Sequence, residues 1–393
     1  MVATLYRGAA LADGLSAQLQ LGVSVLVRDD RIAWIRPHDA EEDTGDAEVV
    51  DCSGATVVPG MVDCHSHLTM PGGAHWIERG SDPPASLLRV AESNGDLQVR
   101  SGVRWARDVG APRGADPLDG RLRALSLGVR DRWRGRRDRP YVRAAGTWIT
   151  RSGTMGTGID VEVDDGDGLL AAAMKQLDDG ADLVKLYMDG PDRDVSPFTA
   201  NEVARVVDAC HARGARVTAH ATVSPGAREC AQTHIDSIEH GMQLDAGICA
   251  LLAAHRTAVV STLTVLRSWR SFATTTDLPR FTSGEGRAVI AAREEAALAS
   301  IALAHRSGVR ICAGTDFGGG SSRANHMAWE VEALVEAGLE PWEALGAATW
   351  RGGELLGEPE AGRLRDGGPA DFFLVHGDPL SDPSALWRVW RVA

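Results

Sequence analysis

The chain has 393 residues, of which 44% are hydrophobic and 24% charged, and its formal net charge is −13. This length allows one large domain with a smaller one beside it. The acidic surplus argues against nucleic acid as a partner, and the absence of a long uninterrupted apolar run argues against a membrane-spanning helix.

The start of the chain and its cysteines indicate a compartment. The opening "MVATLYRGAALADGL" lacks the basic start and the apolar core of a signal peptide. The six cysteines lie far apart and form no CxxC pair, which suits reduced thiols better than a disulfide framework or a cysteine–zinc site. We therefore expect a cytoplasmic protein without a membrane partner.

The two ends of the chain both have the pattern of short strands joined by turns. At the start these are "ATLYRGAAL", "GVSVLVRDDRIAWIRP", with Asp-Asp at a hairpin tip, and "ATVVPG". The tail "GRLRDGGPADFFLVHGDPL" repeats the pattern. We predict that residues 1–57 and 358–393 form one composite β-sandwich domain and that 58–357 form the central domain.

The central segment alternates short apolar runs with helical stretches, for example the amphipathic stretch 199–214 that ends on glycine. Eight strands alternating with helices predict an α/β fold, the (β/α)8 barrel, in which chemistry gathers at the C-terminal ends of the strands. The eight predicted strands are 60–65, 103–109, 141–146, 182–188, 216–221, 234–240, 258–263 and 309–316.

Lys185 is unusual because it lies in the apolar strand "DLVKLYM" of a chain in which 39 of the 41 basic residues are arginine. A buried amine has a lowered pKa and becomes a neutral nucleophile, whereas arginine stays protonated in proteins. The only other lysine, Lys175, lies in a helical stretch and reads as a surface residue. Position and residue type therefore mark Lys185 as a functional candidate.

Metal-competent side chains occur at the ends of the predicted strands. His65 and His67 in "DCHSH" leave the same face of a strand and can close on one ion. Further strands end on residues of the same kind, at the position where a barrel places its active site. Together with Lys185 these are His220, His240 and Asp316.

The sequence resembles the amidohydrolase superfamily, in particular its binuclear metal-dependent hydrolases of the prolidase-like and imidazolonepropionase-like groups. The matching segments are "VVPGMVDCHSH", "DLVKLY", "GARVTAHA", "DSIEHGMQLD", "ICAGTDFG", "EPWEALGAATWRGGELLG" and "GRLRDGGPADFFLVHGDPL". The resemblance covers nearly the whole chain. It implies the barrel, the composite β domain and two divalent metal ions, usually zinc.

The resemblance also implies the ligand set and the mechanism. His65, His67 and Asp316 would hold one ion, His220 and His240 the other, and a CO2-derived carbamate on Lys185 would bridge them. A hydroxide bridging the ions would attack the substrate carbonyl. Asp316 would be the catalytic acid and base that carries the proton to the leaving nitrogen.

Other residues are weaker candidates for contact with a substrate, each with ordinary packing as the alternative. Tyr187 shares the strand face of Lys185 and is a second catalytic candidate, as a donor to the substrate carbonyl. Arg151 could bind a carboxylate, and His75 and His326 follow the first and eighth strands. Glu239 precedes a ligand and could orient one from behind.

We therefore predict a binuclear zinc hydrolase that cleaves an amide-type C–N bond in a small molecule, such as an N-acyl amino acid, a dipeptide or a cyclic amide. Related sites also act on lactones, carbamates and phosphotriesters, and a mononuclear ring deaminase or a scaffold without activity are further alternatives. Met155 stands in "SGTMG", where prolidase-like relatives tend to carry a histidine, so prolidase specificity is not implied. The substrate, the metal loaded in the cell and the oligomeric state, including a homo-oligomer, stay open.

Overall fold

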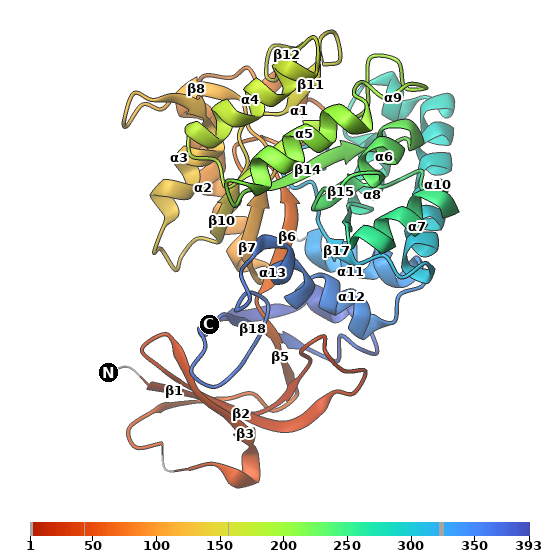
Figure 1. Cartoon of the computed structure of the whole chain (residues 1–393). Helices are drawn as coiled ribbons and strands as arrows, with labels where there is room; N and C mark the ends of the chain where they lie inside the picture. Colours follow the sequence, from red (N-terminus) through yellow and green to blue (C-terminus); the bar gives the residue numbers. More distant parts are fainter. Residues whose placement is uncertain (1–2, 43, 156, 322–325) are drawn as a thin grey trace.

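The structure is a computed structural model that describes residues 3–42, 44–155, 157–321 and 326–393. Two regions are visible in Figure 1: a sheet near the two chain ends, and above it a larger region of strands surrounded by helices. The larger region holds all the predicted metal ligands.

The terminal sheet takes strands from both ends of the chain, in the order β19-β18-β5-β1-β2-β3, with β4 paired to β1. The tail strand β18 runs antiparallel to β5, with Phe373 opposite Val58. The described strands of the two ends form this single sheet, and a sandwich of two sheets stays a prediction. The bounds are β1 (Ala3–Leu11), β2 (Gln20–Arg28), β3 (Arg31–Pro37), β4 (Glu48–Asp51), β5 (Ala55–Pro59), β18 (Phe372–His376) and β19 (Val389–Val392).

The hairpin between β2 and β3 turns at the predicted Asp-Asp tip. Asp29 and Asp30 both have positive φ, 45° and 65°. A two-residue hairpin turn of this type needs positive φ at both central residues, and aspartate tolerates that conformation better than most residues. The turn prediction is confirmed.

Each of the eight predicted central runs contains a strand, and all eight strands pair in parallel. They form two sheets, β10-β7-β6 and β12-β11-β13-β14-β15-β16-β17. Single parallel bridges, Ser66 to Phe317 and Ala145 to Leu183, lie between the two sheets. The bounds are β6 (Met61–Ser66), β7 (Val103–Asp108), β10 (Tyr141–Ala144), β11 (Ile149–Arg151), β12 (Val161–Val163), β13 (Leu183–Tyr187), β14 (Arg216–Ala221), β15 (Ser237–His240), β16 (Ala258–Ser261) and β17 (Ile311–Ala313).

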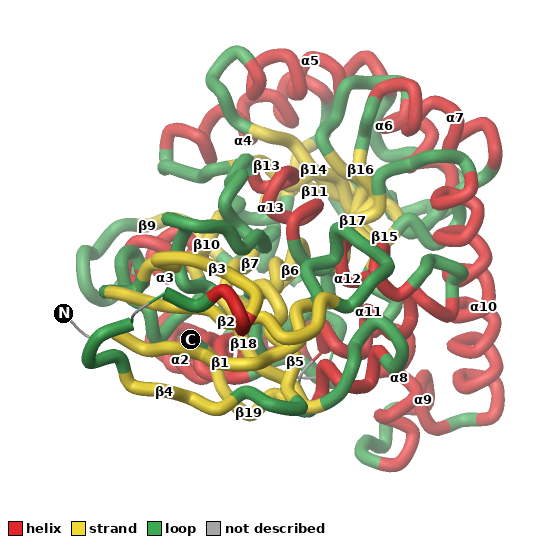
Figure 2. The backbone as a smooth tube through the Cα atoms, turned by 90° about the horizontal axis from the view of Figure 1, so that it is seen from below, coloured by secondary structure: helices red, strands yellow, loops and turns green. Residues whose placement is uncertain are grey.

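Helices lie outside these strands, as the view from below shows (Figure 2). The longer ones are α2 (Pro84–Arg100), α3 (Leu125–Trp133), α4 (Gly166–Asp178), α5 (Ala200–His211), α6 (Ser224–Ala231), α7 (Ala246–His255), α8 (Thr264–Ser271), α10 (Gly284–Arg306), α11 (His326–Glu336), α12 (Pro341–Ala347) and α13 (Trp350–Leu356). The short elements are α1 (Trp76–Arg79), α9 (Pro279–Thr282), β8 (Arg113–Ala115), β9 (Leu122–Ala124) and the 3-10 turns His38–Ala40, Phe272–Thr274 and Pro383–Trp387.

Helix α5 shows how the sequence sets an element. Thr199 caps its first turn and Glu202 bonds back to the cap, a reciprocal capping box. Its buried face repeats at helical spacing through Val203, Val206, Val207 and Cys210. The helix therefore presents one apolar stripe to the parallel strands, as predicted for 199–214.

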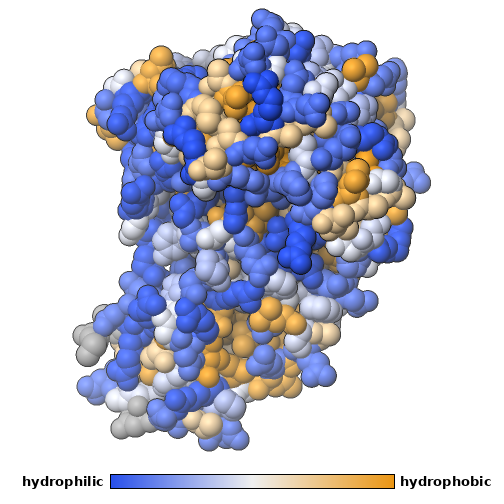
Figure 3. Space-filling view, viewed as in Figure 1, coloured by the Kyte–Doolittle hydropathy of each residue, from blue (hydrophilic) through white to orange (hydrophobic). Residues whose placement is uncertain are grey.

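Apolar side chains fill the space between strands and helices, and the largest buried cluster draws on both. All six cysteines are free and buried, which confirms the prediction of reduced thiols. The face shown in Figure 3 is largely hydrophilic, with hydrophobic residues gathered near the terminal sheet. Among the described helices, none combines the length and apolar character that crossing a bilayer requires.

Candidate active site

His65, His67 and Asp316 meet at one point, where β6 ends and β17 has just ended. Their ligand atoms lie within 4.8 Å of one another, and all three residues are buried. Asp316 Oδ1 is 3.7 Å from Nε2 of His65 and 3.3 Å from Nε2 of His67. Two imidazole nitrogens and a carboxylate oxygen facing one point are a set that suits a divalent transition metal.

Lys185 is buried on β13, and its Nζ has no hydrogen-bond partner among the described residues. Burial lowers the pKa of this amine to about 8, which moves it toward the neutral form. An unpaired buried ammonium is costly, whereas a neutral amine can react or be modified. The direction of the shift is the one predicted for a buried lysine, and the carboxylated state of Lys185 stays a prediction.

His220 and His240 stand next to this group, with ring centroids 4.5 Å apart, and the His240 ring is 4.7 Å from that of His65. Each ring uses one nitrogen to hold its place: His220 Nε2 is 3.2 Å from Asp189 Oδ2, and His240 Nδ1 is 2.7 Å from Thr262 Oγ1. Each therefore keeps its other nitrogen for a ligand.

Burial and neighbouring charges favour the neutral form of His65 and His240. Burial, followed by the charge of Lys185 on His65 and of His220 on His240, lowers the pKa of His65 and His240 well below the ordinary value. A neutral imidazole is the metal-binding form. The electrostatic environment therefore favours ligation over protonation.

The backbone is strained at two of these positions. His240 has φ of 72° and Asp316 of 52°, values that residues with a Cβ rarely adopt. Such strain costs about 1–3 kcal/mol per residue and gathers at functional sites. At His240 and Asp316 it turns the side chain at the point where the strand ends.

A buried polar network behind the site orients His65. Glu239 Oε2 is 2.7 Å from His65 Nδ1, and Glu239 Oε1 accepts a bond of 2.5 Å from Arg107 Nη2. Fixing Nδ1 in this way directs Nε2 toward Asp316. Although burial opposes ionisation, Arg107 and Lys185 hold the pKa of Glu239 below its usual range. The predicted role of Glu239 behind a ligand agrees with this contact.

Asp63 joins the two sheets directly below the site. Its carboxylate accepts hydrogen bonds from the His65 backbone at 3.1 Å and from the Thr315 backbone and hydroxyl at 3.1 and 2.6 Å. Burial raises the pKa of Asp63 to about 6. It therefore fixes the strand that carries His65 against the segment that carries Asp316.

A cavity of about 250 Å³ opens over the site. His220, His240, Asp316 and Tyr187 lie on its wall, and the Tyr187 ring stacks on that of His220 at 3.9 Å. The remaining lining residues are Trp76, Ile77, Arg193, Thr222, Met242, Gln243, Val265, Trp269, Arg280, Arg293, Ala296 and Gly320. A small molecule in this space would touch three of the predicted ligands.

The three weaker substrate candidates lie elsewhere. Arg151 packs its guanidinium over the Phe198 ring, 5.8 Å from the centroid, and His75 is exposed before α1. His326 is buried on α11, with Nε2 3.3 Å from Ser268 Oγ. None of the three is among the residues that line the cavity, and their predicted substrate contacts stay predictions.

The model of the Amidohydrolase family matches residues 56–392, nearly the whole chain. The chain belongs to this family. It is therefore a metal-dependent hydrolase that acts on carbon–nitrogen bonds. The family predicted from the sequence is confirmed.

Two relatives and one solved structure are similar to this amidohydrolase over most of its length. An uncharacterised protein of Mycobacterium tuberculosis is 30% identical over 382 residues, covering 95% of this chain and 91% of that protein. An imidazolonepropionase of Anaeromyxobacter sp. strain K is 28% identical over 404 residues, covering 95% and 87%. A crystal structure of a Xaa-Pro dipeptidase with bound methionine superposes with a TM-score of 0.84 at 24% identity, covering 99% and 98% of the two chains.

Several residues that shape this amidohydrolase site had no predicted role. Asp189 follows β13 and holds His220, and Arg107 lies on β7 and holds Glu239. Although burial opposes ionisation, His220 and Thr222 lower the pKa of Asp189. A search for acidic residues directly after strand ends would have found Asp189. Arg107 carries no such signal, because its partner is 132 positions away.

Proposed function

We propose that this amidohydrolase is a binuclear zinc enzyme that hydrolyses an amide-type C–N bond in a small substrate. In this proposal the two parallel sheets, with their single bridges, form one (β/α)8 barrel of residues 58–357. Residues 1–57 and 358–393 form the second domain. Asp316 and Tyr187 are the catalytic residues.

The donor set fits two ions. His65, His67 and Asp316 would hold one, and His220 and His240 the other, each through the nitrogen that its hydrogen bond leaves free. Zinc ions supply Lewis-acid polarisation of a carbonyl and a lowered pKa for water. Side chains of the protein would bind the substrate and transfer the proton.

Lys185 completes the set as a carbamate. Its neutral amine adds to the carbon of CO2, so that a C–N bond forms, one C–O π bond opens and one proton leaves the nitrogen. The carbamate carries one negative charge, shared by its two oxygens. The buried Nζ without a hydrogen-bond partner is the observation that carries the proposal, because an ordinary structural lysine would be paired or exposed. Burial lowers the pKa of this amine to about 8, while the charges of Glu239 and Asp316 act to raise it.

The protein side chains then handle the substrate and its proton. Asp316 takes a proton from the attacking water and delivers it to the leaving nitrogen. Tyr187, on the cavity wall, donates a hydrogen bond to the substrate carbonyl oxygen. Trp76 and Trp269 contribute apolar surface to the cavity wall on which the substrate would lie.

The names of similar proteins support an amide-type bond. One relative is named an imidazolonepropionase and one structural neighbour a Xaa-Pro dipeptidase. Met155 departs from the prolidase-like pattern, so an Xaa-Pro preference is not part of the proposal.

The two lysines of the chain provide a matched test. Lys185→Ala in zinc-supplemented protein should reduce bound metal from two equivalents to one or fewer, with an activity loss of about 10³-fold or more. Lys175→Ala removes an exposed lysine of α4 paired with Asp179 and should change neither quantity. Metal analysis and turnover of N-acyl amino acids, dipeptides and cyclic amides are the measurements.

Two outcomes contradict the proposal. A Lys185→Ala protein that keeps the metal content of the unsubstituted protein and most of its activity would point to a mononuclear enzyme of the deaminase kind. Turnover of lactones, carbamates or phosphotriesters without any amide turnover would remove the amide bond from the proposal.

A further inference from the structure

Three arginines and one acid line the cavity over the site. Arg193, Arg280 and Arg293 come from three separate segments: the connection after β13, helix α9 and helix α10. Asp316 is the single acidic residue among the described residues of the lining. Because Asp316 is a predicted metal ligand, the described cavity wall offers the three guanidinium groups no other acid, and Asp189 behind the wall lies within ion-pair distance of Arg193 alone among the three.

The three arginines differ in how they are held. Arg193 Nη2 donates to Thr222 Oγ1 at 2.9 Å, and its Nη1 is 3.7 Å from Asp189. Arg280 donates to the backbone oxygen of Ala74 and lies over the Phe281 ring at 4.6 Å. Arg293 has neither a hydrogen-bond partner nor an ion-pair partner in the part of the chain that the structure describes.

The surroundings of Arg293 favour an added anion. Arg293 is an exposed residue, and the partial burial of its guanidinium, then the charge of Arg193, lowers its pKa, while Asp189 acts in the opposite direction. Asp189 already accepts bonds from His220 and Thr222. A carboxylate between Arg193 and Arg293 would remove their mutual repulsion and supply the missing acceptor.

Arg280 and Arg293 lie away from the reacting end of the cavity, whereas Arg193 is 3.7 Å from Asp189, the residue that holds His220. Trp269, Arg280 and Arg293 line both this cavity and an outer hollow of about 490 Å³. They therefore stand at the boundary between the two spaces, whereas Asp316, His220 and His240 line the inner one alone. A group bound by Arg293 is a remote part of the substrate.

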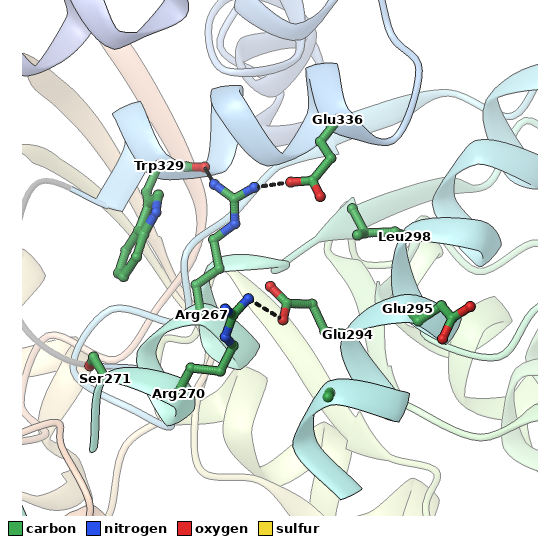
Figure 4. Close-up of a pocket in the computed structure, with 9 residues that line it drawn as sticks. Arg267, Arg270, Ser271, Glu294, Glu295, Leu298, Trp329 and Glu336 are labelled. Carbon is green, nitrogen blue, oxygen red and sulfur yellow. Dashed lines mark hydrogen bonds and ion pairs between the residues drawn. The ribbon is translucent and has the colours of Figure 1, made fainter. Parts of the chain in front are cut away.

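Arginines on the neighbouring helix faces have ordinary partners. A second cavity of about 680 Å³ lies between α8, α10 and α11, and Figure 4 shows Arg267 and Arg270 turned toward acids there. Arg267 pairs with Glu336, and Arg270 pairs with Glu294 at 2.9 Å. These cations are neutralised within the chain, and Arg293 on the opposite side of α10 is not.

We propose that Arg293, with Arg193 and Arg280 beside it, binds the free carboxylate of the substrate. This rests on the proposed amide hydrolysis and narrows its substrate to N-acyl amino acids. Trp76, Met242 and Val265 on the same wall favour an apolar amino-acid side chain. An arginine side chain can donate two parallel hydrogen bonds to the two oxygens of a carboxylate. A neutral carboxamide offers it one acceptor oxygen and no negative charge.

The test compares the hydrolysis of carboxylic acids with that of the corresponding neutral carboxamides by zinc-loaded protein. The substrates are the N-acetyl derivatives of leucine, methionine and phenylalanine and the corresponding C-terminal carboxamides. We expect kcat/KM about 10- to 100-fold higher for the acids. Arg293→Gln should remove most of that preference through KM, with kcat and metal content kept. Arg287→Gln, an exposed arginine of the same helix outside both hollows, should leave it unchanged.

Calorimetric measurement of the binding of the three acids tests the carboxylate site independently of the proposed hydrolysis. Binding that depends on Arg293, without turnover, supports the carboxylate site and contradicts the proposed reaction. Equal turnover of acids and carboxamides, or an acid preference untouched by Arg293→Gln, overturns the carboxylate site and leaves the hydrolase standing. Absence of both binding and turnover for all three acids also overturns it.

Discussion

Glu239 concentrates four hydrogen bonds on one buried carboxylate. It accepts from His65, Arg107, Thr218 and Ser237. One of these partners is a predicted metal ligand and one is a buried cation. The residue therefore links the stability of the strands to the orientation of a ligand.

Glu239→Gln should weaken both properties. An amide has one acceptor oxygen, so Arg107 and the Nδ1–H of His65 cannot both keep an acceptor, and the buried charge of Arg107 loses its pair. We expect a loss of about 3–5 kcal/mol in the free energy of unfolding and a metal affinity lower by about 10- to 100-fold. Urea unfolding and metal titration against a chelator measure the two effects. Glu48→Gln, an exposed acid of β4, is the control. Unchanged metal affinity in Glu239→Gln would contradict the orienting role.

Within the terminal sheet, the side chain of Glu41 links strands β1 and β2. Its carboxylate accepts from Arg7 of β1 at 3.0 Å, from Ser24 of β2 at 2.5 Å and faces His38 Nδ1 at 2.8 Å. Although burial acts to raise it, the bonds from Ser24, His38 and Arg7 lower the pKa of Glu41 to about 2.

The pH dependence of this contact follows from the direction of the shift. The folded state binds the proton less tightly than the unfolded state, so the stabilisation is complete above the ordinary pKa of about 4.5 and is lost as the pH falls toward 2. Glu41→Gln should therefore cost about 1 kcal/mol at pH 7, after allowance for solvent screening, and nothing near pH 2. Urea unfolding of both proteins across this range is the measurement. A deficit that persists at low pH would mean packing, not charge, is responsible.

In the whole molecule, the predicted metal ligands come from both parallel sheets. His65 lies on β6 of the first sheet, and Lys185, His220 and His240 lie on the second. Between the sheets the backbone contributes single bridges such as Ser66 to Phe317. Metal ions held by both sides would close this junction.

Removing metal should therefore lower the stability of the whole chain. At 100 times the dissociation constant a ligand adds about 2.7 kcal/mol, which for a chain of this size corresponds to a melting temperature higher by about 3 °C. Dialysis against a chelator should lower the melting temperature by about this amount, and added Zn²⁺ should restore it. Lys185→Ala should show a much smaller response. Equal responses of the two proteins would show that the metal binds elsewhere.

The sequence determined the elements and the residues at their ends. Strand and helix periodicities are local, so the eight parallel strands, helix α5 and the Asp-Asp hairpin could be read from neighbouring residues. Histidine, lysine and aspartate at strand ends predicted the site for the same reason, because parallel strands bring their C-terminal ends together.

Tertiary structure alone decided which distant side chains meet. Glu239 and Arg107 are neighbours only because the fold brings β15 and β7, which belong to different sheets, close together, and no local pattern marks Arg107. Arg151 was expected in a loop after the third strand, but it ends strand β11 and packs on Phe198, while Arg293, in the middle of a helix, lines the cavity. A side chain's direction depends on how its element packs, and packing is set by contacts between residues far apart in the chain.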